Sequence, residues 1–280
     1  MKFVAILWVL AAAVACLLII ARYNTYKANV KRVEIQVAHS LNGNRLNILH
    51  LTDLHMEKCS IDPQALLNLV KGERIDLIAL TGDYLDTKKM ADRFLQYLDT
   101  LESLKPRYGM YAVFGNHDYV IADHLPYLKR EMEKRNCIVL QNEHRTVTLE
   151  EGSELHIIGI DDHYTGRSDV DRAFQGVGER GIRLVLTHDP NIVLEMKGVS
   201  FDYLLSGHFH GGQIHWPKPY HLKRMGKLPH LQMIRGLHYH RNRAFYISEG
   251  LGQTGFNLRL RSRPEITFHT LCDSLKKSTG

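Results

Sequence analysis

Gly207-His208-Phe209-His210-Gly211-Gly212-Gln213 places two imidazoles two residues apart in a turn flanked by glycines. The turn follows directly on the apolar run Tyr203-Leu204-Leu205-Ser206, which is typical of a buried strand. Histidine nitrogens are common ligands of divalent metals, and two histidines presented in this way can reach two adjacent ions. The stretch therefore predicts a metal-binding turn at the end of a strand.

Four upstream stretches share this design, because each ends an apolar, strand-like run with residues able to bind a hard or borderline cation. In chain order they are Asp53-Leu54-His55, Gly82-Asp83-Tyr84-Leu85-Asp86, Gly115-Asn116-His117-Asp118 and Thr187-His188-Asp189-Pro190. In open α/β architectures, ligands bind in the crevice outside the carboxyl ends of the strands. We therefore expect the five motifs to converge on one site.

The candidate donors are carboxylates, imidazoles and one amide oxygen, without a thiolate: Asp53, His55, Asp83, Asn116, His188, His208 and His210. Such a set suits Mn²⁺, Fe, Zn²⁺ or Mg²⁺ and is large enough for two ions that share one carboxylate. Two ions about 3.5–4 Å apart form a clamp for in-line displacement at phosphorus. We therefore expect a water that bridges both metals, deprotonated to hydroxide, to be the nucleophile.

In their order and spacing, the five motifs resemble the calcineurin-like metallophosphoesterase superfamily, over residues 46 to about 271. The sequence is most similar to the membrane-associated bacterial branch of this superfamily. This similarity is carried by residues 207–213, by the later Gly250-Leu251-Gly252 and Arg263-Pro264-Glu265-Ile266, and by the apolar amino terminus. That branch includes phosphodiesterases and a lipid A precursor pyrophosphatase. The resemblance thus implies hydrolysis of a phosphoester or pyrophosphate bond, in a lipid-linked phosphate among other candidates.

The resemblance also implies a role for each motif residue. The first metal would be held by Asp53, His55, Asp83 and His210, and the second by the bridging Asp83, Asn116, His188 and His208. Both would be divalent, with Mn²⁺ preferred over Fe, Zn²⁺ and Mg²⁺. His117 would be free to protonate the leaving oxygen, with Asp86 as the carboxylate that orients it. The competing interpretations are a structural hydrogen bond for Asp86 and an ordinary turn histidine for His117.

The sequence departs from relatives in two places. Thr87-Lys88-Lys89 follows Asp86, where protein serine/threonine phosphatases have an arginine that grips phosphate, so a protein phosphatase is disfavoured. Phe209 replaces the threonine common between the two histidines, and we expect it to point outward and shape the pocket. His50, His163 and the pair Asp161-Asp162 are interpreted as solvated loop residues, with groups that support the metal ligands as the alternative.

The order of expected elements predicts the fold. Up to residue 114, strands at 33–37, 46–52, 75–81 and 111–114 alternate with helices that begin near Asp62 and span residues 91–104. A helix at 125–135 and a hairpin over 145–160, turning at Glu151-Gly152-Ser153, come next. Strands at 182–187, 201–206, 244–248 and 264–271 follow with little helix between them. This mixture predicts an α/β fold of two packed mixed β-sheets flanked by helices, a four-layer αββα sandwich.

Residues 4–21 contain no charged side chain. The length of this uncharged run is at the lower limit for a helix that spans a bilayer. A cleaved signal peptide is the alternative, but the apolar run continues past Cys16 instead of reaching a polar mature start. We therefore divide the chain into a transmembrane anchor at 1–21, a stalk and first strand at 22–44, a metallophosphoesterase domain at 45–272 and a tail at 273–280. This makes the chain a single-pass protein of the cell membrane.

The charges beside the apolar segment set its expected orientation. Lys2 and the amino terminus precede the segment, whereas Arg22, Lys27, Lys31 and Arg32 follow it. The positive-inside rule then favours a cytoplasmic catalytic domain.

Composition limits the other functions. The 280 residues carry a formal net charge of +6, which motivates a nuclease or nucleotide phosphodiesterase as one alternative. A non-catalytic metal-binding scaffold is another, although a scaffold would not require His117.

The four cysteines lack the spacing of a zinc or disulfide framework. We expect a phosphorylated small-molecule or lipid substrate and the membrane as partners, and no specific nucleic acid; the sequence does not indicate an oligomeric state.

Residues 215–243 contain seven lysines and arginines and no acidic residue, interleaved with apolar side chains. Basic amphipathic segments of this kind bind anionic membrane surfaces. We expect either a lid that takes substrate from the membrane surface or a solvated loop whose apolar residues pack on the domain.

Overall fold

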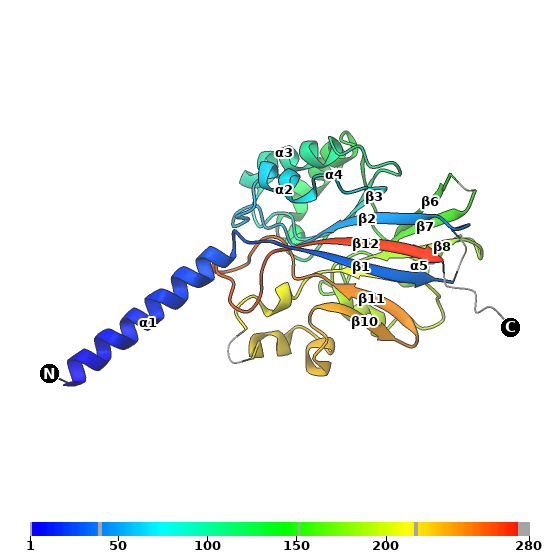
Figure 1. Ribbon diagram of the computed structural model, residues 1–280. Helices are drawn as coiled ribbons and strands as arrows, with labels where there is room; N and C mark the ends of the chain where they lie inside the picture. Colours follow the sequence, from blue (N-terminus) through cyan, green and yellow to red (C-terminus); the bar gives the residue numbers. More distant parts are fainter. Residues whose placement is uncertain (1, 39–40, 151, 216–217, 274–280) are drawn as a thin grey trace.

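The strands form two six-stranded sheets that pack face to face (Figure 1). The computed structural model describes residues 2–38, 41–150, 152–215 and 218–273. In spatial order, the first sheet consists of β1 (Asn29–Val37), β12 (Glu265–Asp273), β2 (Arg45–Leu51), β3 (Leu77–Thr81), β4 (Met110–Val113) and β5 (Cys137–Val139). The second consists of β10 (Gly236–His240), β11 (Arg243–Ile247), β9 (Tyr203–Ser206), β8 (Ile182–Leu186), β7 (Glu154–Gly159) and β6 (Glu143–Thr148).

Both sheets are mixed, as predicted. Strands β2 to β5 run parallel, β12 is antiparallel to β2, and β1 is parallel to β12. In the second sheet β11, β9, β8 and β7 run parallel, while β10 and β6 are antiparallel edge strands. The β6–β7 pair is the expected hairpin, and Glu151 of its turn lies outside the described residues.

Helices cover the outer faces and complete the four layers. The α-helices are α1 (Lys2–Asn24), α2 (Pro63–Val70), α3 (Ala91–Glu102), α4 (Leu125–Glu133) and α5 (Val170–Phe174). The 3-10 turns are η1 (Lys88–Met90), η2 (Asp118–His124), η3 (Pro190–Leu194), η4 (His210–Gly212), η5 (Tyr220–Arg224) and η6 (Leu228–Leu231). Helices α2 to α4 pack on the first sheet, whereas α5 and short turns cover the second.

Local sequence explains the helices. The Asp62 carboxylate accepts a hydrogen bond of 2.7 Å from the Ala65 amide, and Pro63 occupies the first turn of α2. In α3, Phe94, Leu98 and Leu101 share one buried face, as their spacing predicts.

Strand β1 is longer than predicted, because it begins at Asn29 and pairs with β12 along its whole length. This pairing joins segments near the two ends of the chain, which local patterns cannot indicate. Residues 274–280 of the expected tail lie outside the described residues.

Helix α1 projects away from the two sheets (Figure 1). Its most apolar 18-residue window has a mean hydropathy of 3.0 and is not buried by the rest of the chain. It is therefore long and apolar enough to cross a membrane, although signal sequences share this property.

Candidate metal centre

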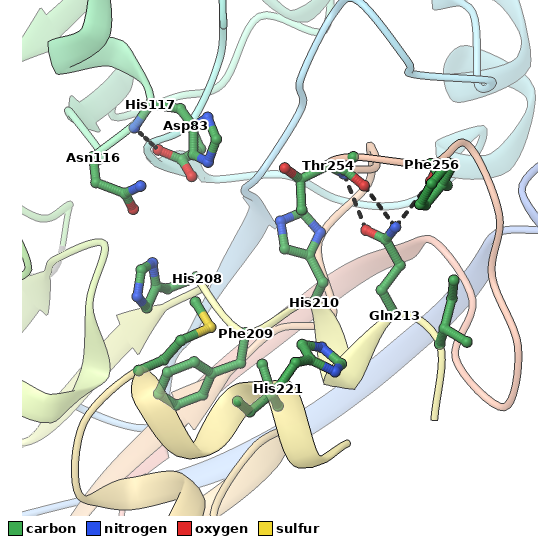
Figure 2. A pocket seen from close by; sticks show the side chains of 14 residues that line it. Asp83, Asn116, His117, His208, Phe209, His210, Gln213, His221, Thr254 and Phe256 are labelled. Carbon is green, nitrogen blue, oxygen red and sulfur yellow. Dashed lines mark hydrogen bonds between the residues drawn. The ribbon is translucent and has the colours of Figure 1, made fainter. Parts of the chain in front are cut away.

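The five motifs follow the carboxyl ends of β2, β3, β4, β8 and β9. Because β2 to β4 run parallel in one sheet and β8 and β9 run parallel in the other, these ends meet at one edge of the sandwich. The structure brings all seven expected ligands to this edge, and Figure 2 shows how Asp83, Asn116, His208 and His210 face a common space.

The donors form adjoining groups whose ligand atoms lie within 4.8 Å of one another: Asp53, His55 and His210 in one, and Asp83, His188 and His208 in another. Asp83 lies between the two groups. Its Oδ2 is 3.6 Å from His55 Nε2 and 3.1 Å from His188 Nε2. One carboxylate is thus within reach of donors from both groups.

Hydrogen bonds orient two of the imidazoles toward this centre. His55 Nδ1 lies 2.8 Å from Asp86 Oδ1, and His188 Nδ1 lies 2.7 Å from the carbonyl oxygen of Thr81. Such bonds occupy one ring nitrogen as a donor and leave the other, here Nε2, as an acceptor for a metal.

Four buried polar atoms at the centre have no hydrogen-bond partner among the described residues: His55 Nε2, Asn116 Oδ1, His208 Nε2 and His210 Nδ1. Buried polar atoms are normally satisfied, so each such atom requires an explanation. Imidazole nitrogens and an amide oxygen beside two carboxylates are donors that divalent cations accept. The residues present therefore fit a divalent-metal centre.

Burial sets the electrostatics of the centre. It would raise the pKa of Asp83, but the positive charge of His188, its hydrogen bond and the charge of His55 hold that pKa well below the usual range. Burial raises the pKa of Asp53 and lowers the pKa of His208 to about 3. An ionised Asp83 and a neutral His208 are the forms that bind metal, whereas His188, whose pKa the charge of Asp83 raises against burial, would lose its proton on binding.

His117 lies beside the donors with its side chain partly exposed to the cavity. Its Nδ1 is 3.0 Å from Asp86 Oδ1, which is the contact predicted from the sequence. Burial would lower the pKa of His117, but the hydrogen bond that its Nδ1 donates to Asp86 and the charge of Asp83 outweigh burial and raise it to about 9. The imidazole is therefore protonated at neutral pH. The same Asp86 oxygen also contacts His55, a second contact that the sequence did not indicate.

Five of the expected ligands have a left-handed backbone. Asp53, His55, Asp83, His208 and His210 have φ of 51°, 37°, 56°, 76° and 49°. Residues other than glycine rarely adopt this conformation, which costs about 1–3 kcal/mol where the surroundings enforce it. The strain is concentrated in the turns that present the donors.

Two glycines allow these turns to pack closely. A Cβ on Gly115 would lie 2.3 Å from Asp83 Oδ1, and one on Gly207 would lie 2.2 Å from Asp53 Oδ2. Any side chain at either position would displace a carboxylate of the centre.

Asp118 has a structural role that the sequence reasoning did not assign. Its buried carboxylate accepts bonds of 2.8 Å from the amides of Asp83 and Tyr84 and one of 2.9 Å from Gly115. It therefore joins the two motif turns that carry Asp83 and Asn116. Its position as the last residue of the motif Gly115-Asn116-His117-Asp118 is the sequence feature that could have indicated this role.

The interpretation of His50, Asp161 and Asp162 as solvated is wrong, because all three are buried, while His163 is half-buried. His50 lies in β2, between β12 and β3, with its Nε2 2.8 Å from Thr81 Oγ1. Burial lowers its pKa to about 3. The polar character of these residues suggested exposure, whereas His50 packs beside His269 and the Asp161 carboxylate accepts a hydrogen bond from the Tyr119 hydroxyl.

A cavity of about 320 Å³ opens above the centre. Apolar side chains line part of it, including Phe209, Leu222, Met225 and Phe256. Phe209 is buried in the core of the second sheet, so the prediction that it points outward is wrong, although it does shape the pocket.

Part of the segment 215–243 forms one wall of this cavity. Leu222 and Leu228 are buried against the second sheet, and the Asn191 side chain bonds the Met225 carbonyl and the Leu228 amide. At these residues the segment packs on the domain, as expected for the alternative of a solvated loop with packed apolar residues. Trp216 of the expected lid lies outside the described residues.

Residues 46–212 match the calcineurin-like phosphoesterase family. The chain is 55% identical over 253 residues to the uncharacterized metallophosphoesterase YkoQ of Bacillus subtilis (strain 168), covering 90% of this chain and 93% of that protein. It is 30% identical over 234 residues to the phosphodiesterase YaeI of Escherichia coli (strain K12), covering 81% and 82%. A transmembrane protein with a metallophosphoesterase domain from Danio rerio is 29% identical over 251 residues, covering 84% and 55%.

The chain belongs to the calcineurin-like phosphoesterase family. It is a metal-dependent hydrolase of phosphoric esters that uses divalent cations and acts on phosphorylated substrates.

Proposed function

We propose that the protein is a membrane-anchored phosphoesterase that uses two divalent metal ions, with Mn²⁺ preferred, and hydrolyses a phosphoester or pyrophosphate bond in a phosphorylated small molecule or a lipid-linked phosphate. The observation that carries the proposal is the position of Asp83, whose Oδ2 is within 3.6 Å of His55 Nε2 and 3.1 Å of His188 Nε2. A carboxylate shared by two donor groups suits a pair of cations.

The ligand assignment follows from the two donor groups. Asp53, His55, Asp83 and His210 would hold one ion, and Asp83, Asn116, His188 and His208 the other. Bound cations acidify a water molecule and neutralise charge on the phosphoryl oxygens.

The chain's own contribution to proton transfer comes from His117 and Asp86. His117 donates a proton from Nε2 to the leaving oxygen, because its Nδ1 is held 3.0 Å from Asp86 Oδ1 and the side chain borders the cavity. Asp86 orients both His117 and His55, which couples the proton donor to one of the metal ligands.

Membrane anchoring rests on α1 and on likeness to a protein named as a transmembrane protein. We propose one span, with the catalytic domain in the cytoplasm because Arg22, Lys27, Lys31 and Arg32 follow the apolar segment. The catalytic domain then spans residues 45–272. Strand β1 precedes it and joins the stalk to the first sheet.

The test uses the full chain purified in detergent and loaded with Mn²⁺. We expect two ions per chain by mass spectrometry of the metal and turnover of bis-p-nitrophenyl phosphate or a lipid pyrophosphate. Near one ion per chain would contradict the dinuclear assignment, whatever the activity. Preferred cleavage of single-stranded DNA would instead favour the nuclease alternative.

A further inference from the structure

A groove runs between the end of α1 and the loop that connects β11 to β12. It has a volume of about 720 Å³ and is lined by Leu18, Ile19, Arg22, Tyr23, Tyr26, Phe256, Asn257 and Leu258. Phe256 also lines the cavity above the metal centre, so the groove and the cavity share a wall. Phe256 is 74% exposed.

The α1 side of the groove is fixed to the catalytic domain. The Arg259 amide donates to the Ala21 carbonyl at 2.9 Å, and Asn24 Nδ2 donates to the Arg259 carbonyl at 3.0 Å. Thr25 is fully buried and contacts Ser60. The groove is therefore a built part of the fold rather than a gap beside a loose linker.

The loop side is fixed to the metal-binding turn (Figure 2). Gln213 Nε2 donates to the carbonyls of Thr254 and Phe256 at 2.7 and 2.9 Å, and Gln213 Oε1 accepts from the Thr254 amide at 3.0 Å. Gln213 is three residues after the candidate ligand His210. The Arg259 guanidinium also donates to the His210 carbonyl. The position of Phe256 is thus set by the same turn that presents a metal ligand.

The sequence of α1 sets the depth of the groove in a bilayer. Leu18 and Ile19 belong to the apolar span, whereas Arg22, Tyr23 and Tyr26 follow at its end. Tyrosine and arginine side chains favour the membrane–water interface. The Arg22 guanidinium donates to the hydroxyls of Thr25, Ser60 and Tyr26. A bilayer around α1 therefore meets the protein at the groove.

We propose that this groove is an acyl-chain subsite: it holds the hydrocarbon chain of a lipid phosphoester whose phosphate lies at the metal centre, and Phe256 contacts the chain where the groove meets the cavity. The subsite rests on the proposed function. Its occupant is a substrate chain because Leu18 and Ile19 of the apolar span line the groove on one side, and the groove shares Phe256 with the catalytic cavity.

The lining supports this occupant. Apolar side chains and the faces of two tyrosines make most of the groove, and none of the described residues that line it is acidic. A hydrocarbon chain gains about 0.8 kcal/mol for each CH₂ group removed from water. A polar or sugar substrate would leave this surface unused.

The first experiment compares two diesters that break the same bond, ethyl p-nitrophenyl phosphate and hexadecyl p-nitrophenyl phosphate, with the full chain in mixed micelles. We expect Phe256→Ser and Leu258→Ser each to lower the hexadecyl-to-ethyl ratio of kcat/KM about tenfold, or about 1.4 kcal/mol. Tyr239→Ser is the matched control, because Tyr239 is 61% exposed on β10 and lines neither cavity. An unchanged ratio in the Phe256 and Leu258 variants would overturn the subsite.

The second experiment separates the subsite from the catalytic proposal. A non-hydrolysable hexadecylphosphonate with a terminal diazirine is photoactivated on the full chain, and labelled residues are mapped. We expect labels at the groove that excess hexadecyl ester suppresses. Labels spread evenly along α1, or cross-linked dimers through α1, would overturn the subsite. Hydrolysis of the ethyl ester without groove labelling would overturn the subsite and leave the phosphoesterase proposal intact. Groove labelling without hydrolysis would support the subsite and contradict the phosphoesterase proposal.

Discussion

The floor and the rim of the catalytic cavity are built differently. The floor consists of Asp83, Asn116, His117, His208 and His210, which directly follow the parallel strands β3, β4 and β9. The rim consists of Leu222, Met225 and Phe256, which lie in a 3-10 turn and loops. The donors are held by backbone hydrogen bonds between the motif turns and by the buried carboxylate of Asp118, whereas the rim depends on side chains from neighbouring segments.

Those side chains are Asn191 for the wall that contains Met225 and Gln213 for the loop that carries Phe256. A rim of this kind can change without moving the donors, which is how loops vary specificity on a rigid scaffold. We infer that the floor determines the chemistry and the rim selects the substrate.

The largest expected effect is at the floor. Asp83→Asn should abolish turnover and lower the bound metal below that of the wild type, because both donor groups lose their shared carboxylate. Metal content and hydrolysis of bis-p-nitrophenyl phosphate measure this. Near-wild-type turnover with two metals per chain would contradict the distinction between floor and rim, because the floor would then tolerate loss of its shared carboxylate.

His117→Ala should retain the metals and lower kcat about 10² to 10⁴-fold with alkoxide leaving groups, as for a lost general acid. The loss should be smaller with p-nitrophenyl esters, whose leaving group scarcely needs a proton. Steady-state kinetics on a series of leaving groups measures it. Equal losses across the series would assign His117 to positioning rather than proton donation.

A smaller effect is expected beneath the floor, at His50. Its pKa is about 3 in the folded protein and about 6.5 in an unfolded chain, so only the unfolded chain gains a proton as the pH falls below 6.5. This group should lower the free energy of unfolding by about 2 kcal/mol between pH 7 and pH 5.

Denaturation of wild type and His50→Gln at several pH values measures this contribution. The difference in stability between the two proteins should shrink as the pH falls. The exposed His230 supplies the control, because His230→Gln should leave the pH slope unchanged. Identical slopes for wild type and His50→Gln would show that the floor does not depend on a neutral histidine between the sheets.

The smallest effect is expected at the outer edge of the rim. Changing the exposed Lys223, Arg224 and Lys227 together to Gln should lower hydrolysis in anionic vesicles about three- to tenfold, because each cation near such a surface contributes up to about 1 kcal/mol. The loss should fade at high salt and be absent with a soluble ester. Equal rates on both substrates would leave this segment as a solvated wall.

The sequence by itself determined the floor's composition. Five apolar runs ending in Asp, His or Asn indicated strands, their carboxyl ends and a shared site, because alternation and capping are local properties. The same patterns predicted the four layers and the helices α2, α3 and α4.

Only the tertiary structure decided how the donors are held and what surrounds them. Positive φ at Asp53 and His208, the bonds from Asp118 to two motif turns, and the burial of His50 depend on contacts between distant segments. The same is true of Phe256, an ordinary loop residue until Gln213 and the end of α1 place it between the metal centre and the apolar helix. Local sequence sets which groups a strand end carries, whereas long-range packing sets the direction in which they point.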